Sequence, residues 1–71
     1  MIKIYLYAAN KSGMEPDDCD KKLIASLGDE NQLYFFKHYI KETYGKSNNM
    51  KITYKLPYQQ ENTILNTFNK L

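Results

Sequence analysis

The sequence predicts a small α+β domain with the element order β-α-α-β-α, in which a two-stranded sheet is covered by helices. Apolar and polar residues alternate in segments 2–8 and 50–56, which is typical of strands with one buried face. Between them, segment 30–44 carries apolar residues at helical spacing. A chain of 71 residues with 42% hydrophobic and 25% charged residues is expected to form a single domain, residues 1–71.

The first strand is predicted over residues 2–8, and a helix is predicted after the turn at residues 10–13. Four apolar side chains share one face of the strand: Ile2, Ile4, Leu6 and Ala8. Pro16 and the aspartates that follow it are typical of a first helical turn. There a proline forfeits only an amide without a partner, and carboxylates favour the positive end of the helix dipole. Gly28 is expected to cap this helix.

The second helix is expected to begin after Asp29 and to end at Gly45, because Asp29 and Gln32 resemble a capping box. Its apolar stripe consists of Leu33, Phe36, Ile40 and Tyr44, widened by Phe35 and Tyr39. A helix with so wide a stripe is expected to contact two neighbouring elements. Tyr34 lies opposite the stripe and is expected to be exposed.

The second strand, residues 50–56, is expected to end at Pro57, and a third helix is expected over residues 59–70. In this last segment Ile64, Phe68 and Leu71 follow helical spacing, although Asn and Thr residues are poor helix formers. A two-stranded sheet has two unpaired outer edges. We therefore expect a second copy of the chain, or a strand of a target protein, to be able to extend it. Strand direction and homodimer formation are left open.

Acidic and basic residues are segregated along the chain. Six of the eight carboxylates lie between Glu15 and Glu30, whereas five lysines and one acid lie between residues 37 and 55. Such a separation can steer and orient a charged partner. We therefore expect a non-enzymatic protein that binds another protein. The predicted partner-binding residues are Glu15, Asp17, Asp18, Asp20 and Tyr34.

The use of amino acids points to a source with AT-rich codons. All ten basic residues are Lys, and the chain has seven Asn and seven Tyr residues. On this basis we expect an inhibitor of a host or defence factor, encoded by a phage or a mobile element.

An alternative function uses the other face of the predicted sheet. Lys3, Tyr5 and Tyr7 would lie beside Lys51, Thr53 and Lys55. Aromatic rings flanked by lysines can stack on unpaired bases and neutralise the phosphates, so this face predicts a module that binds single-stranded RNA or DNA. The absence of arginine counts against this hypothesis, because guanidinium groups favour bidentate contacts to bases and phosphates.

No catalytic, metal or cofactor site is predicted. Asp18 and Asp20 invite a metal hypothesis, but the expected helix start already explains them, and a calcium site needs more converging oxygens. Cys19 is expected to be a buried thiol, and His38 points away from the apolar stripe, so no nucleophile has a base beside it. One cysteine and the lack of a long apolar run favour a cytoplasmic protein.

Overall fold

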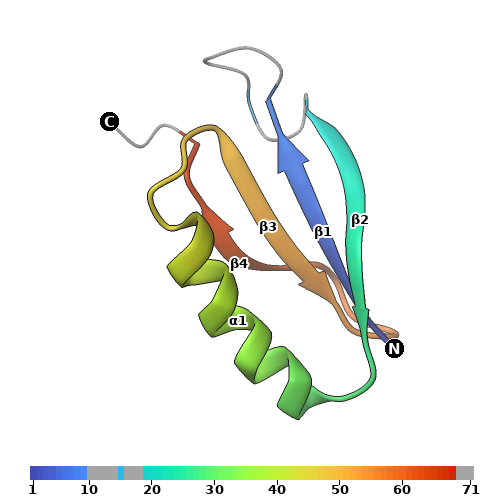
Figure 1. Cartoon of the computed structure of the whole chain (residues 1–71). Helices are drawn as coiled ribbons and strands as arrows, with labels where there is room; N and C mark the ends of the chain where they lie inside the picture. Colours follow the sequence, from blue (N-terminus) through green and yellow to red (C-terminus); the bar gives the residue numbers. More distant parts are fainter. Residues whose placement is uncertain (10–14, 16–18, 69–71) are drawn as a thin grey trace.

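A computed structural model describes residues 1–9, 15 and 19–68 of the chain. Its elements, in chain order, are β1 (Ile2–Ala8), β2 (Asp20–Leu27), α1 (Glu30–Tyr44), β3 (Met50–Lys55) and β4 (Asn62–Asn66). The strands form one sheet in the order β2-β1-β3-β4, and all three neighbouring pairs are antiparallel. Figure 1 shows α1 lying across one face of this sheet. The opposite face, without a helix, is called the open face.

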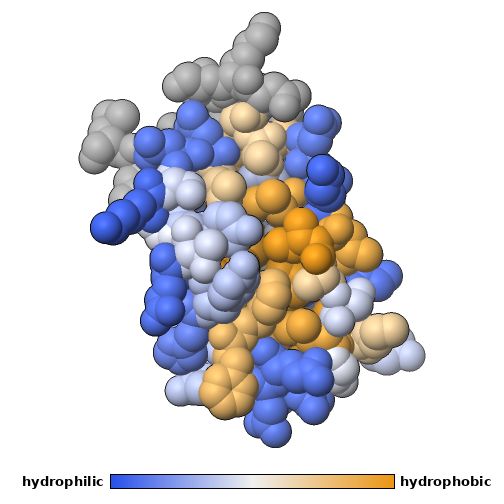
Figure 2. All heavy atoms as spheres, viewed as in Figure 1, coloured by the Kyte–Doolittle hydropathy of each residue, from blue (hydrophilic) through white to orange (hydrophobic). Residues whose placement is uncertain are grey.

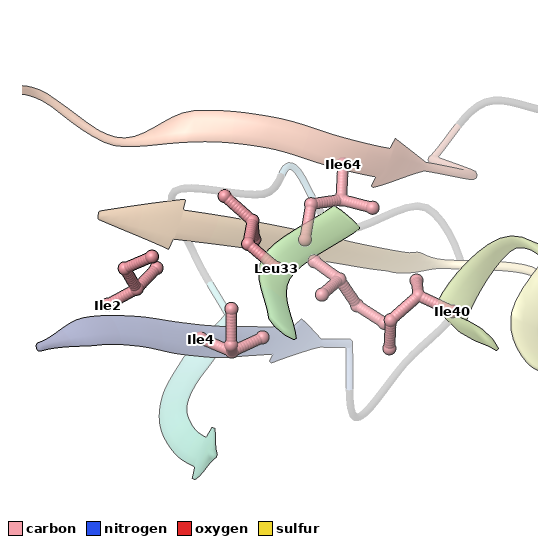
Figure 3. Close-up of a cluster of buried hydrophobic side chains, with 6 residues drawn as sticks. Ile2, Ile4, Leu33, Ile40 and Ile64 are labelled. Carbon is pink, nitrogen blue, oxygen red and sulfur yellow. The ribbon is translucent and has the colours of Figure 1, made fainter. Parts of the chain in front are cut away.

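The core lies between α1 and the sheet. Leu33 and Ile40 of α1 pack against buried isoleucines of three strands, and Figure 3 shows these side chains pointing toward one another. The buried strand residues are Ile2, Ile4, Ile52 and Ile64. The strand residues Ile2 and Ile4 alternate with the exposed Lys3, as the sequence predicts for β1.

The predicted helix at residues 16–27 is wrong, because residues 20–27 form the edge strand β2. The pairing of β2 with β1 contains a bulge: Ile4 faces Ala25 and Tyr5 faces Leu23, which leaves Ile24 as an extra residue. This extra residue breaks the period of two and places apolar residues at spacings that resemble a helix. Residues 16–18, the expected start of the helix, lie outside the described residues.

The predicted helix at residues 59–70 is also wrong, because residues 62–66 form β4. A second bulge explains the error. Ile52 pairs with Leu65 and Thr53 with Thr63, so Ile64 is the extra residue, and it is buried in the core. The sheet therefore has four antiparallel strands and one helix, in the order β-β-α-β-β, in place of the predicted two-stranded sheet covered by several helices.

The helix α1 confirms the prediction for its start. The backbone amide of Gln32 donates to the Asp29 carboxylate at 2.9 Å, and the Gln32 side chain accepts from the amide of Gly28 at 2.8 Å. The helix contacts more than one strand, as expected, but the wide apolar stripe is not buried as a whole. Phe35 is 70% exposed and Tyr39 is 52% exposed, so only the narrow stripe that contains Leu33 and Ile40 is buried against the sheet.

Candidate functional site

The open face brings together the lysines and tyrosines that the sequence places there. The pairing of β1 with β3 sets Lys3 opposite Lys55, Tyr5 opposite Thr53 and Tyr7 opposite Lys51. Because side chains alternate along a strand, these six residues share the face opposite the core residue Ile4. The predicted juxtaposition is therefore confirmed, while its use remains a hypothesis.

The edge strand β2 adds a cation to this face that the sequence analysis assigned to a helix. Lys21 pairs with Tyr7 in the register of β1 and β2. Its Nζ lies 4.2 Å from the centroid of the Tyr5 ring, within the range of a cation–π contact. Lys51 lies on the other side of the sheet centre, with its Nζ 5.5 Å from the Tyr7 ring.

On the open face, the side chain of Glu61, which precedes β4, contacts side chains of β1 and β2. Its carboxylate accepts a hydrogen bond from the Tyr7 hydroxyl at 2.5 Å and forms an ion pair with Lys21. Glu61 directly precedes β4, and Figure 1 shows the connection from β3 to β4 returning behind the sheet on the side away from α1. The last strand is therefore linked to β1 and β2 by side chains, although it pairs only with β3.

The ionisation of this cluster follows from its contacts. Burial raises the pKa of the Glu61 carboxyl, but the hydrogen bonds from Lys21 and Tyr7 outweigh burial, and the pKa lies below its ordinary value. The hydrogen bond to Glu61 raises the pKa of the Lys21 ammonium. Burial and the bond to Glu61 raise the pKa of the Tyr7 phenol. The cluster is thus held as a carboxylate, an ammonium and a neutral phenol at neutral pH.

A hollow of about 320 Å³ lies at the other end of the open face. Its walls come from the start of β1 and the end of β3, and its lining residues are Met1, Lys3, Tyr5, Lys55, Leu56 and Pro57. Two lysines and one aromatic ring therefore converge here, and Lys21 of the Glu61 cluster lies over the Tyr5 ring. Of the five residues proposed for nucleic-acid binding, the structure separates Tyr7 and Lys51, beside Glu61, from Lys3, Tyr5 and Lys55.

The predicted acidic surface is only partly described. Glu15 and Asp20 are exposed, and Asp17 and Asp18 lie outside the described residues. Asp20 begins the strand β2 and does not belong to a helix, so a helix dipole does not account for its position. Lys21 and Lys22 follow Asp20 directly, and their positive charges offset part of the negative charge of this segment.

The sequence assigns Phe35 and Tyr39 to the apolar stripe of α1, but the structure exposes both rings. Tyr34 is 60% exposed, which confirms its predicted exposure, and Phe35 and Tyr39 are exposed beside it. The ring of Tyr34 contacts Phe35 and His38 edge to face, with centroids 5.5 Å and 4.8 Å apart. The name aromatic surface is used below for Tyr34, Phe35 and Tyr39. A solvent-facing helix surface is ordinarily polar.

Further apolar groups lie next to α1. Figure 2 shows apolar side chains gathered beside the helix, on the side where β1 and β2 lie. Leu6, Ala25 and Leu27 project from the core face of these strands and are only partly buried. In β2, Ile24 at the bulge is exposed, and so is Leu23, which pairs with Tyr5 on the open face. The helix therefore leaves part of the apolar surface of the sheet uncovered.

The described residues contain no group of three or more His, Cys, Asp or Glu side chains that could hold a metal ion. His38 is exposed, and its ring packs on Tyr34. Cys19 is half-buried, and its thiol donates to the carbonyl oxygen of Glu15 at 3.2 Å.

Comparison with known proteins gives no relative. No protein-family model, no curated protein and no solved structure matches the chain. Among the described residues, no helix is both long enough and apolar enough to cross a membrane. Function is therefore argued from the surfaces of this chain alone.

Proposed function

We propose that this chain is a non-enzymatic protein that binds another protein through the aromatic surface of α1. The observation that carries the proposal is the exposure of three large rings on the solvent side of one helix: 60% for Tyr34, 70% for Phe35 and 52% for Tyr39. Rings of this kind are enriched at the centres of protein interfaces, where they bury a large area and lose few rotamers. Isolated exposed apolar residues need no such explanation, but a cluster does.

The contacts among the rings favour binding. Tyr34 packs against Phe35 and His38, and Tyr39 packs against Phe36 with centroids 5.7 Å apart. The rings are therefore held by their neighbours before a partner arrives, which lowers the entropy lost on association. Phe36 also packs against the core, so it fixes the position of the Tyr39 ring relative to the rest of the domain.

The chemistry of the aromatic surface indicates which kind of partner can bind it. A helix that presents aromatic side chains fits an apolar groove in a second protein, with acceptors at the rim for the hydroxyls of Tyr34 and Tyr39. A charged partner is not required, because the acidic segment no longer forms a helix start. An inhibitor of a host or defence factor remains the form of protein binding that the composition favours.

The test compares two triple variants of α1. Y34S/F35S/Y39S removes the aromatic surface, and N31S/K41S/E42S removes three exposed polar side chains of the same helix without a change in net charge. In calorimetric titration with one purified partner, the wild-type protein and the control variant are expected to bind it. The aromatic variant is expected not to bind it. The partner is first found as the protein captured by the wild type and the control but not by the aromatic variant.

Two further measurements complete the test. Circular dichroism must show equal helix content in the three proteins, since exposed rings contribute little to the core. Measurement of mass in solution shows whether the partner is a second copy: a wild-type dimer that becomes monomeric in the aromatic variant would assign the surface to self-association. Equal capture of the same proteins by all three forms would refute the proposal.

A further inference from the structure

We propose that the hollow at the end of the open face binds a nucleoside phosphate, with Lys3 and Lys55 holding the phosphate and Tyr5 stacking on the base. This site is independent of the proposed function. Lys3 and Tyr5 project from the face of β1 opposite Ile4, whereas the aromatic surface lies on α1, beyond the core face. Loss of one activity therefore leaves the other intact.

The first argument is the pairing of two like charges. Lys3 and Lys55 are direct cross-strand partners on the same face, an arrangement that destabilises a sheet. In the described part of the chain, the ion pair recorded is that of Lys21 with Glu61, and no carboxylate pairs with Lys3 or Lys55. An anion placed between the two ammonium groups would turn this repulsion into attraction. The lysines therefore indicate an anion as part of the ligand.

The second argument is the aromatic wall of the hollow. Tyr5 lines it, while Lys21, which lies over the Tyr5 ring, is not among the lining residues. A tyrosine beside two cations presents a π-face to a base and positive charge to its phosphate. The volume of about 320 Å³ is at the lower end of the range for small-ligand pockets. A single nucleotide is therefore a suitable occupant.

The third argument is the position of Tyr58. The amide of Gln59 donates to the carbonyl of Leu56 at 3.2 Å, Pro57 is the second residue of this turn, and Tyr58 has φ 66°. This turn position favours glycine, because a side chain is strained at positive φ. Tyr58 nevertheless carries a fully exposed ring, directly after a residue that lines the hollow. The ring does not line the hollow itself, but it is exposed beside it and is available to stack on a base that extends past Pro57.

The ligand has two sources, a free nucleotide or one nucleotide of a single strand. Lys51 lies farther along the same face and extends the positive charge beyond the hollow, whereas Lys21 is already paired with Glu61. Lys51 favours a strand, because a strand carries a further phosphate that this lysine could neutralise. The shared chemistry is a base next to a phosphate, and the experiment separates the two sources.

The probes are a fluorescein-labelled oligothymidylate, followed by fluorescence anisotropy, and thymidine monophosphate, followed by amide chemical shifts. Y58G removes a ring but relieves the positive φ, so weaker binding cannot be attributed to a less stable fold. K3Q/K55Q removes the paired charges, and K41Q/K46Q is its control, with the same loss of charge at two exposed sites on α1 and its following loop.

We expect K3Q/K55Q and Y58G each to raise the dissociation constant for the oligonucleotide by about fivefold or more. K3Q/K55Q should also lower the dependence of binding on salt by about one unit of slope per lysine. Shifts of residues lining the hollow with the monophosphate alone would identify a free nucleotide as the ligand, and shifts with the oligonucleotide only would identify a strand.

Three outcomes would overturn the proposal. The first is no binding of either probe at low salt. The second is an equal loss of affinity in K41Q/K46Q and K3Q/K55Q, which would show attraction by net charge without a site. The third is wild-type affinity in Y58G and K3Q/K55Q. Thermal unfolding of each variant confirms that the compared proteins are folded.

Discussion

The hydroxyl of Tyr7 donates a hydrogen bond of 2.5 Å to the carboxylate of Glu61, 54 residues away in the sequence. Tyr7 belongs to the central strand β1, and Glu61 precedes the edge strand β4. The same carboxylate pairs with Lys21 of β2. Side chains of the open face thus link both edges of the sheet to its centre.

Glu61→Gln is expected to lower stability at neutral pH by about 1 kcal/mol, since a partly exposed ion pair and its hydrogen bond contribute modestly. The pKa of Glu61 is lowered by folding, so its contribution is complete above the ordinary carboxyl pKa of 4.5 and is lost as pH falls through the folded value. Urea unfolding at neutral and at acidic pH measures the difference between wild type and variant. That difference should vanish in acid, and a difference independent of pH would contradict the assignment.

Lys3→Gln is expected to raise the stability of the free protein by roughly 0.2–1 kcal/mol, because it removes the like-charge pair with Lys55. Added salt should narrow the difference between variant and wild type, since it screens the repulsion. Thermal unfolding at two salt concentrations measures both effects. Lys46→Gln, at an exposed position in the loop before β3, is the matched control and should change stability little.

Thr53→Val and Thr67→Val are expected to have opposite effects, although both residues are 1% exposed. The buried hydroxyl of Thr53 has no hydrogen-bond partner among the described residues, so its removal should stabilise the protein by about 1 kcal/mol. The hydroxyl of Thr67 accepts from the Met50 amide and donates to the Met50 carbonyl, both at 3.0 Å. Its removal should destabilise the protein by about 1–3 kcal/mol. Chemical unfolding of both variants measures the change in the free energy of unfolding. Changes of the same sign in the two variants would contradict the hydrogen-bond assignment.

The elements with regular periods could be predicted from the sequence. The strand β1 alternates without interruption, β3 does so from Met50 to Lys55, and α1 has an unambiguous N-cap in Asp29. The face shared by Tyr5 and Thr53 followed from this alternation alone. The face on which each residue lies could therefore be anticipated in the centre of the sheet, whereas the antiparallel direction and the register could not.

The two edge strands could not be predicted in the same way. Each contains a bulge, at Ile24 in β2 and at Ile64 in β4, and each bulge places two apolar residues in succession. This pattern is typical of a helix as well as of an interrupted strand. Glu61 gave no local signal, because its partners are set by the approach of distant strands. Phe35 and Tyr39 were assigned to the core because periodicity gives the width of a stripe but not how much of it is covered.

The strand order has a consequence for the rate of folding. The central strand pair, β1 with β3, places Lys3 opposite Lys55. The middle of the sheet therefore cannot form until the loop between these two residues, which includes β2 and α1, has closed. Closing so long a loop costs entropy before the core repays it, and domains with such distant pairings fold more slowly than helical domains of similar length. α1 can form from local contacts, but its buried face finds Ile4 and Ile64 only after this closure. Because α1 can form before this closure, strengthening the Asp29 cap should speed folding more than it slows unfolding.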